Sequence, residues 1–322
     1  MLDVISHWWW SAVDRLSTHA VAPALDFAHL GNRIGEPEDI AFTLLIGLLQ
    51  IVIIACVFRP LETLAPAESW QDRKLTRVDL RFALLLVGLG PLLAFFVLSP
   101  FAQAFGSAAA TVGLPSEGLL HFIPRIAEHP YLAFGLYYVA NDLAYYWMHR
   151  AQHAIPWWWA LHNMHHSQRQ VNCWTNARVN WLDVVIESCL LATVGLIMGV
   201  DAGQFAFLVL LTQLVQNLAH TNTRLGFGRI YDRIFVDPRF HRLHHMVTDP
   251  SRPRLHDCNY GQVLSMWDNL FGTALYGEPV RATGVGDPAV DADNDHGAIA
   301  MQWFALRRFW NAFTTRAGWK PQ

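Results

Sequence analysis

Three short segments of the chain carry histidines at helical spacing. His149 and His153 lie four residues apart, and two later segments share the pattern H-x2-HH: His162, His165 and His166, then His241, His244 and His245. Residues three or four positions apart lie on the same face of a helix. The imidazoles of each segment can therefore converge on one metal ion, as two such histidines do in zinc metalloproteases.

A single histidine pair at this spacing is common, and it usually does no more than solvate a helix end. Three such segments, two of them with identical spacing, favour a metal site instead. The eight imidazoles exceed the four ligands of a tetrahedral site, which indicates two metal ions. Imidazole binds Fe, Zn, Cu and Ni, so the ligand type leaves the metal open.

Acidic residues near these segments are candidates for supporting roles. Asp142 precedes His149 by seven residues on the same helical face, and a carboxylate there could orient a ligand histidine through its second ring nitrogen. Glu187 in an apolar segment and Asp237, four residues before His241, are two more candidates. The alternative for all three is ordinary hydrogen bonding between helices.

The composition is that of a membrane protein. Hydrophobic residues make up 53% of the 322 residues and charged residues only 15%, against about 25% in soluble domains. Segments near the roughly 20 apolar residues that a bilayer crossing needs lie at 40–58, 80–98, 131–148, 183–200 and 204–220, and Pro91 should bend the second. The net charge of −3 and the lack of a basic run argue against a nucleic-acid partner.

The basic residues predict an orientation. With five spans, 20 of the 23 Lys and Arg residues fall on one side, which the positive-inside rule makes cytoplasmic. We therefore expect an all-α, polytopic membrane helical bundle of about five spans with a cytoplasmic, histidine-rich di-metal cap. The N-terminus lies outside, the C-terminus lies inside, and the absence of organelle signals suggests a bacterial cytoplasmic (inner) membrane.

The segments NDLAYYWMHRAQH, WWWALHNMHHS, HRLHH and NYGQVLSMWDNLFGT resemble the fatty acid hydroxylase / sterol desaturase superfamily of integral membrane di-iron oxygenases. The resemblance covers roughly 130–277. It implies two Fe ions, O2 as co-substrate and oxidation of a C–H bond in a lipid or sterol. It also implies a further ligand between the second and third histidine segments, and His220 fits that place. His256, just before Asn-Tyr-Gly, is a further ligand candidate, or else a surface histidine.

The expected function is hydroxylation or desaturation of a lipid or sterol substrate taken from the bilayer. The chain shows no dinucleotide fingerprint and no haem-domain signature, so electrons should come from a separate ferredoxin- or cytochrome-type donor with its reductase. Arg239, Arg242, Arg252 and Arg254 could steer an acidic donor, or else set topology and contact lipid phosphate. The alternatives are a membrane di-zinc metallohydrolase and a haem electron carrier with two histidine ligands.

Four regions follow from these patterns. They are an N-terminal interfacial segment (1–39), an accessory transmembrane hairpin with an external loop (40–130), the catalytic region (131–277), and a loop with a C-terminal interfacial helix (278–322). In the last region, 300–313 alternates aromatic residues with Arg307 and Arg308, which is typical of a helix lying at a membrane surface.

Overall fold

A computed structural model describes residues 2–31, 35–70, 72–113, 118–200, 202–247, 251, 255 and 257–314. Within these residues the regular elements are helices, apart from one isolated bridge between Met246 and Thr283. The prediction of an all-α fold is therefore confirmed.

Each of the five predicted spans is helical. They correspond to α3 (Pro37–Ile53), continued by η3 (Ile54–Phe58) and α4 (Arg59–Leu64), to α5 (Lys74–Leu93) with η4 (Ala94–Leu98), and to α8 (Pro130–Ala154), α10 (Trp181–Met198) and α11 (Ala202–Ala219). By length and composition, two runs in the described chain could cross a membrane. These are Pro37–Leu64, with a mean hydropathy of 2.8, and Trp181–Met198, with 1.8.

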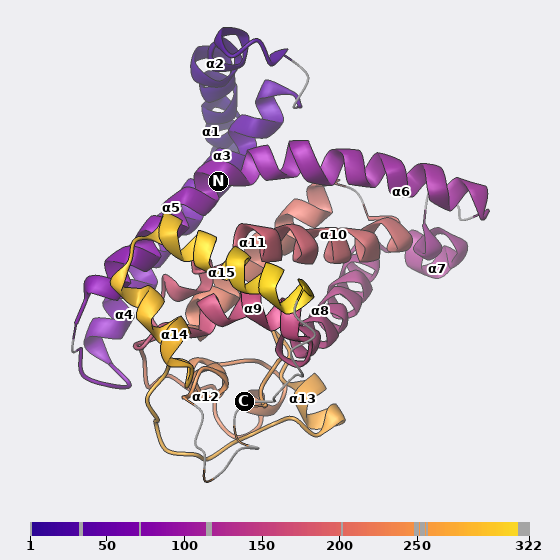
Figure 1. Ribbon diagram of the computed structural model, residues 1–322. Helices are drawn as coiled ribbons and strands as arrows, with labels where there is room; N and C mark the ends of the chain where they lie inside the picture. Colours follow the sequence, from indigo (N-terminus) through magenta and orange to yellow (C-terminus); the bar gives the residue numbers. More distant parts are fainter. Residues whose placement is uncertain are drawn as a thin grey trace.

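The second predicted span continues further than its apolar sequence. The helix changes to a wider turn over 94–98, shortly after Pro91, and then continues as α6 (Ser99–Thr111). A proline lacks the N–H that an unbroken helix needs, so a change of geometry close to it is expected. In Figure 1, α6 leaves the direction of α5 and runs across the end of the bundle.

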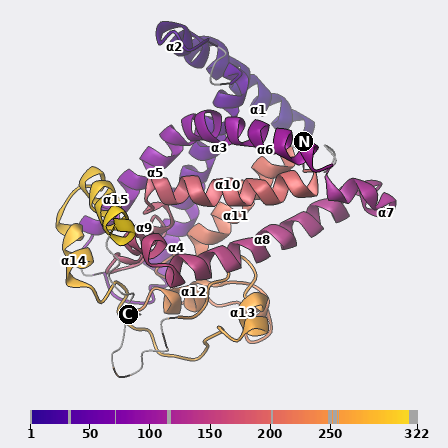
Figure 2. The ribbon, with the colours of Figure 1, turned by 45° about the vertical axis from the view of Figure 1, so that its right-hand side comes forward.

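The N-terminal helices form a small unit of their own. α1 (Leu2–Leu16), η1 (Ser17–Val21) and α2 (Ala22–Phe27) pack on the start of α3 through Val13, Val21, Leu25, Ile40 and Ala41. They lie at the opposite end of the bundle from α12 (Pro238–His244) and α13 (Met266–Phe271) in both ribbon views (Figures 1 and 2).

The remaining described elements are short, apart from the last helix. They are η5 (Leu119–Phe122), α7 (Pro124–Ala127), α9 (Pro156–His166), η6 (Thr175–Ala177), η7 (Tyr231–Arg233), α14 (Pro288–Asp291), η9 (Ala292–Asp295) and α15 (Ala298–Thr314). α15 packs along α9, which carries the second histidine segment.

The helices at the five predicted spans each bring one end together beside this histidine region. The end of α4 accepts hydrogen bonds from the segments after α9 and α11, because Glu62 receives the amides of Cys173 and Asn222 at 2.7 and 2.9 Å. The end of α8 joins the start of α10 through Gln152 and Asp183, 2.9 Å apart. These buried polar contacts hold the histidine-bearing segments against the bundle.

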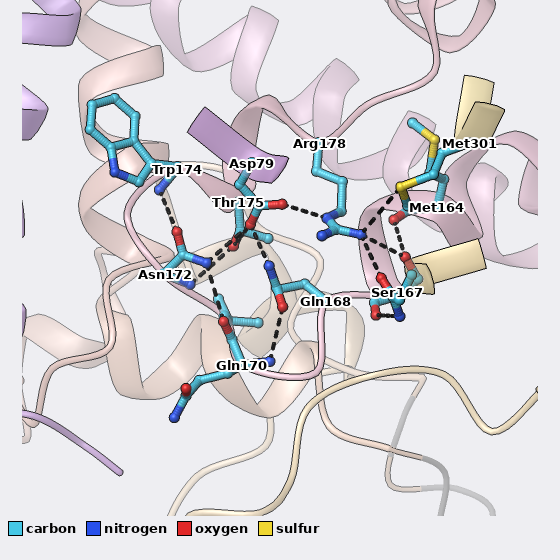
Figure 3. A network of polar contacts seen from close by, with 12 residues as sticks. Asp79, Met164, Ser167, Gln168, Gln170, Asn172, Trp174, Thr175, Arg178 and Met301 are labelled. Carbon is cyan, nitrogen blue, oxygen red and sulfur yellow. Dashed lines mark hydrogen bonds and ion pairs between the residues drawn. The ribbon is translucent and has the colours of Figure 1, made fainter. Parts of the chain in front are cut away.

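Asp79 on α5 makes a further group of these buried contacts. Its carboxylate binds the Arg178 guanidinium at 2.6 Å and also accepts hydrogen bonds from Gln168, Asn172 and Thr175 (Figure 3). The Asp79 and Arg178 side chains are both completely buried. The carboxylate therefore fixes the loop 167–178, which directly follows the second histidine segment.

Candidate metal centre

The structure brings nine of the ten predicted histidine ligands into two adjacent sets. In each set the ligand atoms all lie within 4.8 Å of one another. The five-histidine set contains His149, His153, His162, His166 and His244, and the four-histidine set contains His165, His220, His241 and His245. The tenth, His256, lies outside the described residues.

The five-histidine set draws on all three histidine segments. The Nε2 atoms of its five rings are buried, and within the described chain none has a hydrogen-bond partner. Leaving buried polar atoms without a partner costs free energy. Five such nitrogens facing one point therefore fit a metal ion.

The four-histidine set has the spacing of a tetrahedral site. The Nε2 atom of His220 lies 3.2 Å from that of His165, 3.0 Å from that of His241 and 3.2 Å from that of His245. Ligand nitrogens at 2.0–2.1 Å from a tetrahedral ion would be about 3.3 Å apart. The two sets are neighbours, since the rings of His166 and His245 stack with centroids 4.4 Å apart.

Local sequence explains how the helices present these rings. α9 begins with Pro156 in its first turn, where a missing N–H costs nothing. α12 begins with Asp237 as N-cap, accepting the Phe240 amide at 2.7 Å, followed by Pro238. Asp237, predicted as a supporting residue from its position, thus lies at the start of the third histidine segment and caps its helix.

Backbone carbonyls orient several of the rings. The Nδ1 atoms of His149, His244 and His220 lie 2.9, 2.8 and 2.7 Å from the carbonyl oxygens of Tyr260, Cys258 and Gln216. A carbonyl can only accept, so these Nδ1 atoms carry the proton and donate it. The Nε2 lone pair is then free for a metal, as is usual for histidine ligands.

Asp183 orients His162, and sequence reasoning missed it. Its carboxylate lies 3.2 Å from His162 Nδ1 and accepts hydrogen bonds from Trp158 Nε1 at 2.7 Å and Gln152 at 2.9 Å. The predicted candidate Glu187 lies one turn further along α10, half-buried, with no hydrogen bond or ion pair to a histidine in the described chain. The signal that could have found Asp183 is its place on the same helical face as Glu187, one turn nearer the helix start.

Asp142 has a different role from the one its spacing suggested. Its carboxylate accepts the amides of Val263 and Leu264 at 3.0 and 3.1 Å and the Trp267 indole N–H at 2.9 Å. It reaches His149 only through the loop that it holds, since Tyr260 belongs to the same loop. The seven-residue spacing correctly placed Asp142 on the same helix face as His149. At the position of Asp142, however, this face packs against the loop and not against a histidine ring.

Two further residues fix this loop, and sequence reasoning assigned neither to the site. Asp268 accepts the amides of Tyr260 and Gly261, both at 2.8 Å. Asn259 has a positive φ of 59°, a conformation that asparagine tolerates better than most residues. Its side chain donates to Phe240 O at 2.8 Å and accepts from the Leu275 amide at 2.7 Å. Both residues lie in the NYGQVLSMWDNLFGT motif, whose structural role is to fix the loop that carries Tyr260 beside His149.

The electrostatics of the site favour neutral imidazoles. Burial, followed by the proximity of other histidines, lowers the pKa of His165, His166, His241 and His245 well below the usual value. Burial also lowers the pKa of His244, to about 3. A neutral imidazole has the lone pair that a metal needs, so these rings are ready to bind one at neutral pH.

Fold and site together define an all-helical protein with a candidate two-metal centre made of histidine. Residues 134–273 match the fatty acid hydroxylase family, so the resemblance drawn from the histidine motifs is confirmed for this segment. No solved structure matches the chain.

The relatives act on lipids or sterols according to their names. The chain is 29% identical over 229 residues to an ornithine lipid hydroxylase of Rhizobium tropici, covering 70% of this chain and 65% of that protein. It is 28% identical over 182 residues to the alkylglycerol monooxygenase of Homo sapiens, covering 56% of this chain and 38% of that one. A Delta(7)-sterol 5(6)-desaturase of Gibberella zeae is 28% identical over 138 residues, which are 43% of this chain and 40% of that protein. The matches thus span less than two thirds of these relatives.

Proposed function

We propose that the chain is an O2-dependent di-iron membrane oxygenase. It would hydroxylate, or desaturate, a C–H bond of a lipid or sterol-type substrate. The observation that carries the proposal is the pair of converging histidine sets, five and four imidazoles with their ligand atoms within 4.8 Å of one another. Two adjacent sets, each large enough for one ion, suit a two-metal centre.

Iron suits this site and this chemistry. Imidazole is a good ligand for iron, and bound iron would supply O2-dependent oxidation of an unactivated C–H bond, which no acid or base of the protein can achieve. The protein's own groups hold the ligand rings in place. Asp183 and the carbonyls of Tyr260, Cys258 and Gln216 fix their orientation, and burial keeps water away.

The substrate class rests on the relatives and on an apolar groove. Ornithine lipid, alkylglycerol and sterol appear in the relatives' names. Between α5 and α10 lies a groove of about 270 Å³, lined by Leu86, Leu89, Gly90, Leu92, Leu93, Trp181 and Val184. Its lining is apolar, so it suits a hydrocarbon chain.

Electrons would come from a separate ferredoxin- or cytochrome-type donor with its reductase. Of the four arginines considered for steering an acidic donor, Arg239 is 56% exposed at its side chain, near Asp232. Arg242 is buried and pairs with Glu68, so it is not free for a donor. Arg252 and Arg254 lie outside the described residues.

We also propose the membrane placement that the sequence predicts: five spans, N-terminus outside, and the histidine centre on the cytoplasmic side of a bacterial inner membrane. One observation supports this placement: hydrogen bonds join the ends of five helices at the histidine region, namely α4, α5, α8, α10 and α11. A di-zinc hydrolase gains no support, since neither set includes a carboxylate among the described residues.

The test combines metal analysis with lipid mass spectrometry. Purified protein should hold two irons per chain without a haem absorption band. Cells expressing the protein should contain a lipid shifted by one oxygen atom, or by the loss of two hydrogens, that cells carrying His165→Ala lack. Iron-loaded protein that oxidises nothing in a broad lipid panel with competent donors would overturn the proposal.

A further inference from the structure

α15 exposes a continuous apolar face that no described part of the chain covers. Ile299, Trp303, Trp310 and Phe313 are 62, 65, 65 and 59% exposed. Their spacing, completed by partly exposed Leu306, places them on one side of the helix. A soluble protein rarely leaves such a contiguous patch open, so this face has a partner.

The opposite face of α15 is firmly attached to the bundle. Ala298, Met301, Gln302 and Ala305 are buried, and α15 packs along α9. Phe309 lies against the Trp157 ring, with centroids 5.9 Å apart, and Phe313, although 59% exposed, reaches the same ring at 5.6 Å. The outward direction of the apolar face is therefore fixed by the fold.

Gln302 ties α15 to the first turn of α10, one of the two helices able to cross a membrane. Its side-chain oxygen accepts the Trp181 amide at 3.0 Å, its amide group donates to Val179 O at 2.7 Å, and its carbonyl accepts from Asn180 at 3.1 Å. If α10 spans the bilayer, its first residue marks the level of the bilayer surface. α15 is then held at that level, with Trp181 and the apolar groove beside it.

We propose that α15 lies in the interfacial layer of the bilayer, its apolar face in contact with phospholipid. Two outward tryptophans seven residues apart suit this layer, where aromatic rings are enriched. The exposed Arg307 on the flank of this face can bind lipid phosphate. The partner is the membrane that holds α10, because the apolar face of α15 starts beside Trp181, the first residue of α10.

This placement fixes the height of the metal centre above the membrane. Arg308, on the inward side of α15, donates to Asn163 at 3.3 Å and to Asp293 at 2.6 Å. Asn163 lies between His162 and His165 on α9. The helix that rests on lipid is thus joined directly to the helix that carries three of the histidines. This consequence for the centre rests on the proposed function, whereas the contact with lipid does not.

The test measures the depth of single fluorescent labels in bilayers of phosphatidylcholine and phosphatidylglycerol. Cys56→Ser and Cys189→Ala remove the accessible thiols, since Cys173 and Cys258 are buried. Labels then replace Trp303 or Trp310 through Trp303→Cys or Trp310→Cys. Two controls are matched to them: exposed Asp295→Cys at the end of η9, just before α15, and Leu190→Cys, 45% exposed in the middle of α10.

We expect labels at 303 and 310 to be quenched most by nitroxide lipids whose probe lies near the headgroup. The label at 190 should respond most to a mid-chain nitroxide, and the label at 295 to a water-soluble quencher. Labels at 303 and 310 that behave like the one at 295 would overturn the proposal. So would protection from lipid and soluble quenchers alike, which would show that protein, such as a second copy, covers the face. None of these readouts requires enzyme activity, so they remain informative if the proposed function fails.

Discussion

At the scale of single residues, the assignment of each histidine to one of the two sets predicts which metal ion is lost when that histidine is replaced. The sequence motifs alone do not predict this. His165 and His166 are neighbours in sequence, yet their rings belong to different sets. If each set holds one ion, removing one ligand should empty mainly its own set. Two substitutions in different sets should then leave similar total metal contents, but the remaining ion should lie in a different set in each variant.

His165→Ala and His153→Ala should each lower bound metal to about half that of the parent protein. Each should abolish lipid oxidation, since a two-metal reaction needs both ions. Metal content is measured by mass spectrometry of the purified protein. His7→Ala, in exposed α1 far from both sets, should change neither quantity. Full turnover of His165→Ala would show that the set is wrongly assigned.

Asp183 and Glu187 offer a second comparison at this scale. Asp183→Ala removes the acceptor for His162 Nδ1, and loss of such a partner typically weakens metal binding 10–100-fold. Asp183→Asn keeps an acceptor oxygen and should be milder. Titration of metal-free protein with Fe2+ measures the difference. Glu187→Gln serves as the control because, among the described residues, its side chain has no hydrogen bond or ion pair with a histidine. Equal effects at both positions would contradict the role assigned to Asp183.

The buried histidines also predict how stability depends on pH. The pKa of His165, His166, His241, His244 and His245 is lowered in the folded chain, while the unfolded chain keeps the usual value of about 6.5. The unfolded chain therefore takes up more protons below pH 6.5. Stability contributed by these groups is complete above that pH and is lost as the pH falls, by up to about 1.4 kcal/mol per pH unit for each histidine.

The thermal midpoint of metal-free protein in detergent should accordingly fall between pH 7 and pH 5, a range chosen to bracket the histidine pKa of about 6.5. Metal-loaded protein should show the same fall at lower pH, because a bound ion occupies the nitrogen that would take the proton. Scanning fluorimetry at a series of pH values measures both curves. Curves that coincide with and without metal would contradict the assignment of these rings as ligands.

At the scale of helices, the sequence predicted what depends on local spacing. The three histidine segments form helices as their spacing indicated. What could not be predicted depends on how helices approach one another. Asp183 contacts a histidine 21 positions earlier only because α10 packs beside α9, and the spacing of Asp142 gave no sign that a loop lies in between.

The contact between α5 and the loop 167–178 is another of these distant interactions. Asp79→Ala would leave the buried Arg178 guanidinium without its carboxylate, which typically costs 3–5 kcal/mol. We expect a large drop in the thermal midpoint and reduced metal content, since the loop follows His165 and His166. Arg169→Ala is the control, because its ion pair with Asp291 is exposed and should contribute about 1 kcal/mol or less. Equal losses for the two variants would contradict this difference.

At the scale of the whole molecule, orientation in the membrane connects the charge pattern with the fold. The sequence predicts that the ends of spans near residues 58, 80, 148, 183 and 220 share one side, which the positive-inside rule makes cytoplasmic. The structure joins these same ends by hydrogen bonds, among them Ala67 to Asn222 and Arg224 to Ala65. α1 and α2 lie at the other end of the bundle (Figures 1 and 2). The charge pattern and these hydrogen bonds therefore group the same helix ends together, and the compartment that these ends face can be measured directly.

Reporter fusions in a bacterial host identify it. A reporter active only in the cytoplasm should give signal after residue 314, and one active only outside should give signal after residue 113, where α6 has ended. Arg73, Lys74, Arg77 and Arg81 at the start of α5 dominate the charge of the first connection. Replacing these four with Gln should therefore weaken the preference for one orientation, while replacing Arg15 with Gln should strengthen it slightly. A C-terminal reporter active only outside would overturn the orientation and leave the metal centre facing away from cytoplasmic electron donors.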